Sequence, residues 1–184
     1  MVAPFPIVAI VPSMRKVGVV CLDARLRPLR CRLRSLRKRR TRAAKVAAMR
    51  AEIERCARLH GAPILVVETA SNRRRDIGRV LMALATHGEA LGMHVVRLAT
   101  SDAYARVSGI PCAFAAAERL AVRYDPVRKR VLDGNRRLLK SFGRWREIRP
   151  LIAAFALAHA HAVRTIVGTA NGAPLPAASD PPHI

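Results

Sequence analysis

The sequence predicts an α/β domain with a mixed five-stranded sheet flanked by helices. Three short apolar segments with brief connections come first, and this pattern indicates an antiparallel meander. Strand-like and helix-like segments then alternate, as is typical of parallel strands joined by covering helices. The chain has 184 residues, of which 51% are hydrophobic, so it is long enough to bury one sizeable core.

The meander is expected to use residues 7–11, 17–23 and 29–34, with a turn over residues 12–16. In the third strand, apolar and basic residues alternate with the period of two that a strand requires. This alternation predicts one buried face and one wholly cationic face, the cationic one formed by Arg30, Arg32 and Arg34.

The alternating part of the chain begins with a helix that Thr41 caps and Gly61 ends. The continuous apolar segment 62–68 ends in Glu68 and fits a buried central strand. Asp76 and Asp102 are both interpreted as residues that open or cap a helix. The remaining expected elements are a strand at 93–98 and helices at 76–91, 102–107, 113–122 and 147–163.

The order of these elements, βββ-α-β-α-β followed by helices, is that of an RNase H-like fold. We expect residues 1–167 to form this single domain. Residues 168–184 are rich in Pro, Ala and Ser, and they are expected to form a disordered tail.

Positive charge dominates the composition, with 34 Lys and Arg against 12 Asp and Glu and a net charge of +22. Such an excess usually serves a polyanion, and nucleic acid is the expected partner. No apolar segment is long enough to span a membrane, so a membrane partner is not expected. Aromatic residues make up only 4%, so binding should depend on the nucleic-acid backbone rather than on base stacking. The predicted nucleic-acid-binding residues are Arg15, Lys16, Arg30, Arg32, Arg34, Arg37, Lys38, Arg39, Arg40, Arg73, Arg74, Arg75, Arg144 and Arg146.

The four cysteines are far apart and form no CxxC or Cys/His cluster. They are interpreted as small buried residues in a reducing compartment, and zinc is not expected. The first residues show no basic segment followed by an apolar one, so we expect an intracellular protein, in the cytoplasm, nucleoid or an organelle matrix.

Three parts of the chain together resemble the RuvC-type Holliday-junction resolvases of the RNase H-like superfamily. The resemblance extends over about residues 7–163 and depends on the order and spacing of short segments. These segments are residues 7–23, then 64–68 with 77–81 and 94–109, and finally 156–161.

The resemblance implies a metal site that this sequence has largely lost. Members of that family cut DNA with two magnesium ions held by four acidic or histidine positions, because hard cations need oxygen ligands. Carried over by position, these fall on Val11, Glu68, Ile148 and Leu151, so only Glu68 keeps an acid. We therefore expect no bound metal, no magnesium cofactor and a catalytically inactive nuclease homologue that binds branched DNA or structured RNA.

Two alternatives to this interpretation remain open. The first is an active, magnesium-dependent Holliday-junction endonuclease with a relocated site built from Glu68, Glu147 and Asp76. The second is a structural component of a nucleoprotein assembly. A homodimer formed through apolar helices, or pairing with an active nuclease, is compatible with either.

Overall fold

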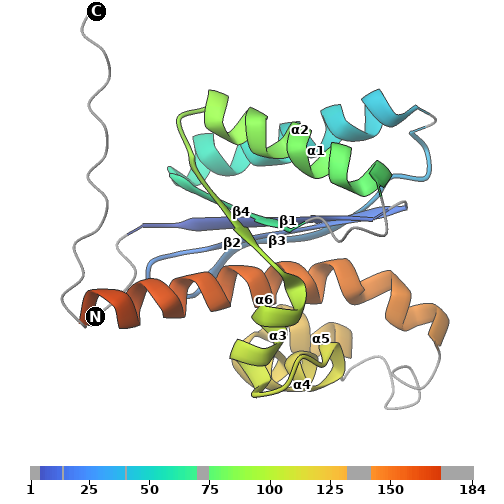
Figure 1. The fold of residues 1–184 in the computed structure, drawn as a ribbon. Coiled ribbons are helices and arrows are strands. Elements are labelled where there is room, and N and C mark those ends of the chain that lie inside the picture. The colour runs from blue at the N-terminus through green and yellow to red at the C-terminus, as the bar shows by residue number, and fades with distance from the viewer. Residues whose placement is uncertain (1–4, 14, 40, 70–74, 132–141, 171–184) are drawn as a thin grey trace, which may run out of the picture.

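The computed structural model describes residues 5–13, 15–39, 41–69, 75–131 and 142–170 (Figure 1). One sheet of five strands forms its centre, in the order β3-β2-β1-β4-β5. Helices cover both faces of this sheet, so the predicted fold class is confirmed. The strands are β1 (Ile7–Pro12), β2 (Lys16–Leu22), β3 (Pro28–Ser35), β4 (Ile64–Glu68) and β5 (His94–Leu98).

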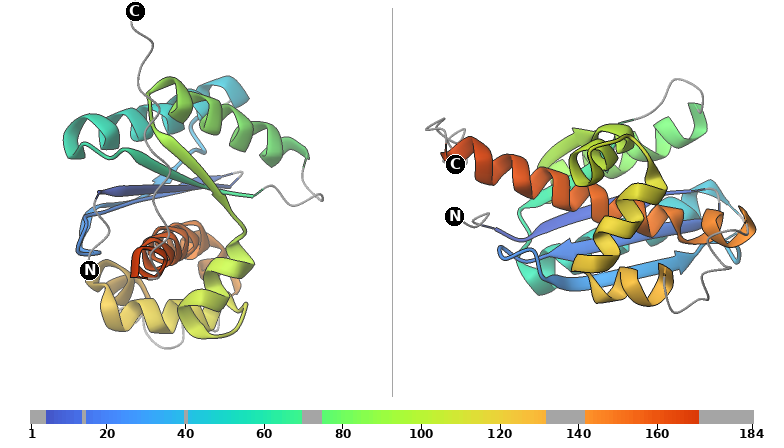
Figure 2. Two further views of the ribbon diagram at one scale, coloured as in Figure 1. Left: turned by 60° about the vertical axis from the view of Figure 1, so that its left-hand side comes forward. Right: turned by 90° about the horizontal axis from the view of Figure 1, so that it is seen from below.

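The helices form two layers of different character. Two long helices lie on one face of the sheet, and on the other face the longest helix lies between the sheet and three short helices (Figure 2). The first face carries α1 (Arg42–His60) and α2 (Arg75–Ala90). The second carries α3 (Thr100–Ser108), α4 (Ala113–Arg123), α5 (Asp125–Val131) and α6 (Phe142–Ala170).

The strand directions bring several chain segments to one edge of the sheet. β1 pairs antiparallel with β2 and parallel with β4, and β4 pairs parallel with β5. The carboxyl ends of β1, β4 and β5 therefore meet at a common edge, which we call the Glu68 edge. The amino ends of α1, α2 and α6 lie at this same end of the molecule, on the right in Figure 1. This edge is where open α/β sheets usually place their functional sites.

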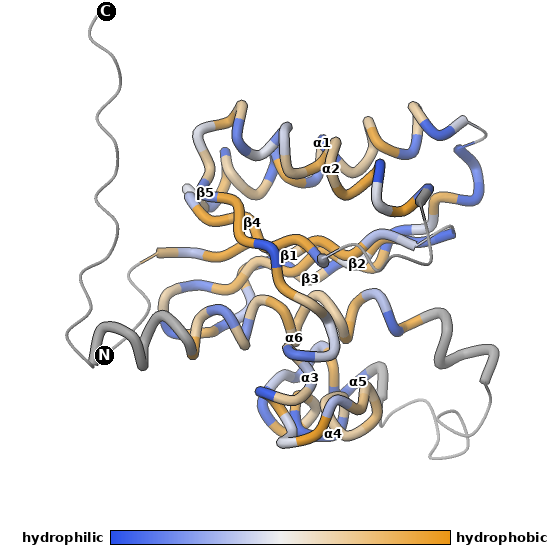
Figure 3. The backbone as a smooth tube through the Cα atoms, in the orientation of Figure 1, coloured by the Kyte–Doolittle hydropathy of each residue, from blue (hydrophilic) through white to orange (hydrophobic). Residues whose placement is uncertain are grey.

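Side chains alternate across the sheet and form two apolar cores. In β1, Val8 and Ile10 face α1 and α2, whereas Ile7, Ala9 and Val11 face α6. The tube coloured by hydropathy shows apolar residues throughout the central strands and in the middle of α6 (Figure 3).

A glycine permits the close packing of α6 on the sheet. A Cβ atom added at Gly18 of β2 would lie 2.1 Å from the Pro150 carbonyl oxygen and 2.6 Å from the Leu151 nitrogen. Any larger residue at this position would therefore collide with the backbone of α6. Gly18 pairs with Val11 in the sheet, so the contact sets the start of the buried part of α6 directly beside the end of β1.

Several predicted boundaries need correction. The last helix begins at Phe142 rather than at residue 147 and continues to Ala170, so residues 168–170 are helical and do not belong to a tail. The early start was missed because residues 143–147 are mostly polar and show no apolar stripe. The N-cap of α3 is Ala99, so Asp102 lies in the first turn and is not the cap. The basic segment 128–140 is helical as far as Val131, and its remainder lies outside the described residues, as does the tail from residue 171.

The interpretation of the cysteines as small buried residues agrees with the structure. Cys21 and Cys56 are fully buried, and Cys31 and Cys112 are half-buried; all four are free thiols. His159 of α6 contacts Tyr124, whose hydroxyl group lies 3.0 Å from its Nδ1 atom. Burial lowers the pKa of His159 to about 4, so the imidazole is neutral at physiological pH.

Candidate nucleic-acid interface

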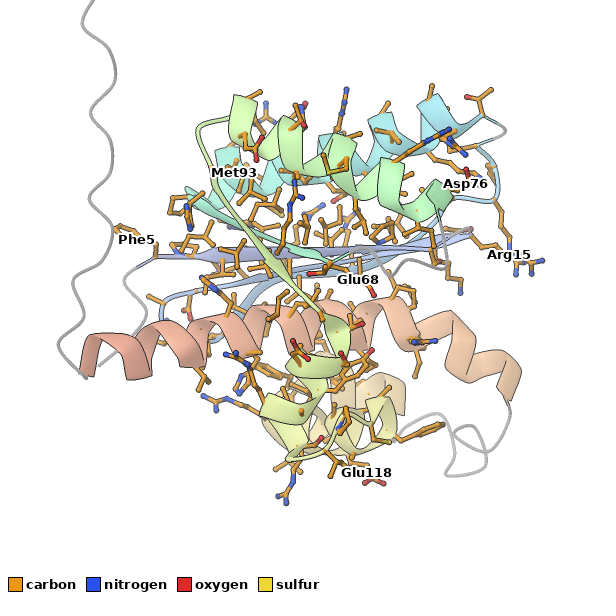
Figure 4. All side chains as sticks on the ribbon, viewed as in Figure 1. Phe5, Arg15, Glu68, Asp76, Met93 and Glu118 are labelled. Atoms are coloured by element: carbon orange, nitrogen blue, oxygen red, sulfur yellow. The ribbon has the colours of Figure 1, made fainter. Side chains whose placement is uncertain are left out.

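Glu68 is the last residue of β4 and is half-buried. Val66, two residues earlier, belongs to the core beneath α6, so Glu68 lies on that same face of the sheet (Figure 4). The hydroxyl group of Thr100, the first residue of α3, donates a hydrogen bond of 2.9 Å to Glu68 Oε1. The sequence had suggested Arg73, Arg74 or Arg75 as its partner, but these side chains lie outside the described part of the chain.

The neighbours of Glu68 on this face are apolar where a metal site would need oxygen atoms. The parallel register pairs Ile10 with Val67, which places Val11 beside Glu68 at the strand ends. Val11 is 5% exposed and Leu151 is fully buried. Ile148 packs against the same core. None of these three side chains can donate an electron pair, so the residues present do not fit a pair of magnesium ions.

The relocated metal site also fails to form among the residues that can be described. Asp76 forms an ion pair with Arg42, on the side of the sheet that α1 and α2 cover. Glu68 lies on the opposite side, and the side chain of Glu147 lies outside the description. No group of three or more His, Cys, Asp and Glu side chains comes together within the described ranges.

Two residues that the sequence analysis missed border Glu68. Tyr104 of α3 is 4% exposed, and burial raises the pKa of its hydroxyl group. The nearby Arg149 guanidinium group of α6 opposes this pKa shift, whereas the Glu68 carboxylate adds to it. Arg149 is exposed and follows Ile148 directly, so a cation stands between the two apolar positions of α6. Only the packing of α3 against α6 reveals this group, because no spacing in the sequence connects these residues.

Five of the predicted cationic residues gather at the Glu68 edge. Arg15 lies in the turn between β1 and β2 and is exposed. The Leu36 N–H group, just after β3, donates a hydrogen bond of 2.7 Å to the Arg15 carbonyl oxygen, so the turn and the end of β3 lie together. The cations that these two segments contribute are Arg15, Lys16, Arg37, Lys38 and Arg39. Figure 4 shows Arg15 at the same end of the molecule as Asp76, where α2 begins.

The predicted cationic face of β3 differs from a row of free arginines. Glu52 of α1, which is 1% exposed, lies against this face. The Arg30 Nη2 atom lies 2.9 Å from Glu52 Oε2, and the Arg34 Nη1 atom lies 3.1 Å from Oε1. The prediction that Arg30 binds nucleic acid is therefore wrong, since its side chain is only 13% exposed and neutralises a buried carboxylate. Arg34 is shared between Glu52 and solvent, and Arg32 is exposed.

A signal for Glu52 was present in the sequence. Met49, Ile53 and Cys56 form the apolar stripe of this helix, and Glu52 lies within that stripe by helical spacing. An acid on a buried helix face requires a cationic partner, and the alternating arginines of β3 were the nearest basic strand.

The remaining predicted cations are only partly described. Arg40, Arg73 and Arg74 lie outside the described residues. Arg75 opens α2, and Arg144 and Arg146 lie in the first turns of α6, but the positions of these three side chains are not described. Their backbone positions still put both helix starts at the Glu68 edge.

Sequence comparison places this chain in no family, since no protein-family model and no curated protein sequence matches it. Two solved structures of RuvC from Thermus thermophilus do match. The first has a TM-score of 0.63 and 17% sequence identity, covering 89% of this chain and 97% of that one. The second, described as RuvC in complex with a Holliday junction substrate, has the same TM-score and identity and covers 90% and 97% of the two chains. The chain has a RuvC-like fold.

This likeness confirms the predicted architecture. Nearly the whole of the matched chain is covered, so the RuvC-like part includes the sheet and both helical layers. Among the helices of the described residues, none has the length and apolar character needed to cross a membrane.

Proposed function

We propose that this RuvC-like protein binds branched or structured nucleic acid at its Glu68 edge and does not cut it by two-metal chemistry. The proposal rests on one combined observation. The Glu68 edge is basic, and the positions around the Glu68 carboxylate where a metal site would need oxygen atoms are apolar. Val11, Ile148 and Leu151 surround the position where metal-binding oxygen atoms would be required.

The charge of the edge supports binding to the phosphate backbone. Exposed cations from the β1–β2 turn and from the end of β3 stand beside the amino ends of α1 and α6, neither of which has an acidic residue in its first turn. Helix amino ends carry a partial positive charge and attract phosphate groups. The similarity to a RuvC structure solved with a Holliday junction substrate favours a branched ligand.

The binding part of the proposal is tested with a four-way DNA junction, a linear duplex of the same arm sequence and a structured RNA. We expect a gel shift with the junction in EDTA, and no further gain in affinity when Mg²⁺ is added. In Lys38→Ala/Arg39→Ala, the slope of log K against log salt should fall by about 1.8, because each lost phosphate contact contributes about 0.9. An unchanged slope would show that Lys38 and Arg39 at the Glu68 edge do not contact the nucleic acid.

The inactivity part is tested by incubating the junction with Mg²⁺ or Mn²⁺. We expect no specific incision by the protein or by Glu68→Ala. The control is Glu118→Ala, which removes an exposed carboxylate on α4 (Figure 4). Incision that is lost in Glu68→Ala and kept in Glu118→Ala would show an active nuclease and defeat the proposal.

Assembly remains a prediction with its own measurement. Sedimentation with and without the junction would distinguish a monomer from a homodimer, and an added active nuclease would reveal pairing. Nucleic acid that copurifies with the protein, once sequenced and treated with nucleases, would distinguish a junction-binding protein from a component of an RNA-containing assembly.

A further inference from the structure

An open pocket lies on β3, at the border of the sheet farthest from β5. It is lined by Cys31, Arg32, Leu33 and Arg34 of β3 together with Arg55 of α1. The strand order puts β2 and β1 between this pocket and β4, so it is about 14 Å from the Glu68 strand at a typical strand spacing. The three arginines point to the face that α1 covers, whereas Glu68 points to the α6 face. The pocket is thus separate from Glu68, whereas its Arg34 pairs with Val17, next to Lys16 of the Glu68 edge.

The guanidinium groups at this pocket are held by a buried carboxylate. Glu52 Oε1 lies 3.1 Å from Arg34 Nη1 and 3.9 Å from Arg55 Nη1. Glu52 Oε2 is occupied by Arg30, which donates from both Nε and Nη2, at 3.3 and 2.9 Å. Arg34 is therefore fixed by a hydrogen bond to this carboxylate, and Arg55 lies within ion-pair distance of it.

The arginines at this pocket have N–H donors that Glu52 does not engage, and the pocket has a net positive charge. A guanidinium group has five N–H donors, and Glu52 engages only a few of those on Arg34 and Arg55. Their side chains are 38% and 43% exposed, so the other donors face solvent at the pocket. Four guanidinium groups, counting exposed Arg32, surround one carboxylate. The neighbouring acid, Glu54, pairs instead with His87 of α2.

We propose that this pocket binds a phosphodiester group of the nucleic-acid backbone, as a second contact distinct from the Glu68 edge, with Glu52 as its positioning residue. Fixed guanidinium forks match the oxygen geometry of a phosphate better than single ammonium charges do. This inference deepens the proposed function, and it requires a ligand that reaches both sites. Two such sites, one at the strand ends and one at the β3 border of the sheet, suit the diverging arms of a branched molecule.

The test compares the parent protein with Arg32→Ala/Arg55→Ala on a four-way DNA junction and on an RNA junction of equal arm length. We expect the slope of log K against log salt to fall by about 1.8. Affinity should fall on the order of tenfold for each contact. The matched control is Arg106→Ala/Arg119→Ala, which removes two exposed arginines from α3 and α4 and should leave affinity within about twofold.

A second variant separates a built site from general attraction. Arg32→Lys/Arg55→Lys keeps the charge but loses the planar fork, so its affinity should fall while the salt slope stays near the parent value. Parent-like affinity in this variant would overturn the phosphate site. If the parent binds the junction and the alanine pair binds it equally well, the inference fails while the proposed function stands. If the parent binds no junction of either kind, both fail.

Discussion

The two faces of this sheet place a glutamate side chain in contrasting environments. On the face covered by α1, Glu52 is buried and is neutralised by arginines of β3. On the face covered by α6, Glu68 stands at a strand end with a hydroxyl donor from Thr100, apolar Val11 beside it, and Tyr104 and Arg149 nearby. The same type of side chain is thus part of the stabilising framework on one face and stands at a half-buried strand end on the other.

The difference follows from solvent access. A carboxylate that is fully removed from water needs charged partners, because its desolvation penalty is several kcal/mol. A carboxylate at a half-buried strand end keeps part of its hydration, so it does not need the same set of charged partners.

The largest effect is expected from Glu52→Gln. Loss of the carboxylate leaves Arg30 buried without a counter-charge, and breaking a buried pair in this way costs about 3–5 kcal/mol. Urea unfolding measures the loss. Glu118→Gln, on an exposed surface, should change stability by less than about 0.5 kcal/mol. Equal stability of the two variants would mean that the cluster around Glu52 contributes nothing to folding.

The α6 face should be most sensitive at Gly18. Gly18→Ala forces a methyl group into the Pro150 backbone, and we expect a loss of about 3 kcal/mol as α6 shifts from the sheet. The comparison is Gly92→Ala, where φ is +72° and no atom lies within 4 Å of the added Cβ. That variant should lose about 1–2 kcal/mol from backbone strain alone. A smaller loss at Gly18 than at Gly92 would contradict the close contact.

The α6 face should also lose stability on acidification through His159. Burial lowers the pKa of His159 from 6.5 to about 4, so the unfolded chain binds this proton first as the pH falls. The contribution of neutral His159 is complete above pH 6.5 and is lost as the pH falls through about 4, by up to about 3 kcal/mol. Unfolding at pH 7, 5.5 and 4 should show a smaller decrease in His159→Gln than in the parent. His94→Gln, at an exposed position of β5, should follow the parent curve.

The smallest effect is expected at Glu68 itself. Thr100→Val removes the hydroxyl group that donates to Glu68 Oε1, and this hydrogen bond is half-buried, so a loss of about 1 kcal/mol is expected. Thr69→Val, at an exposed neighbouring position, serves as the control in the same unfolding experiment. A loss as large as that of Glu52→Gln would show that Glu68 belongs to the stabilising framework, and the contrast between the two faces would disappear.

Sequence patterns predicted the elements well because each depends on local spacing. The period of two in β3, the cap at Thr41 and the stop at Gly61 are all properties of neighbouring residues, and the structure confirms them. The apolar residues near Glu68 could also be predicted. Aligning the order of elements with that of the resembled family was enough to identify Val11, Ile148 and Leu151. The predicted helix ends were less accurate where charged residues interrupt the apolar stripe, as at the start of α6.

By itself, the sequence predicted the fold class and the basic character, since composition and periodicity act through nearest neighbours, and the resemblance to the RuvC-type resolvases implied the apolar residues near Glu68. Only the tertiary structure decided which cations are exposed and which neutralise a buried carboxylate. Glu52 and Arg30 are 22 residues apart, and nothing local states that they meet. Burial favours their pairing, because an unpaired charge between α1 and β3 would cost several kcal/mol of the stability of the fold.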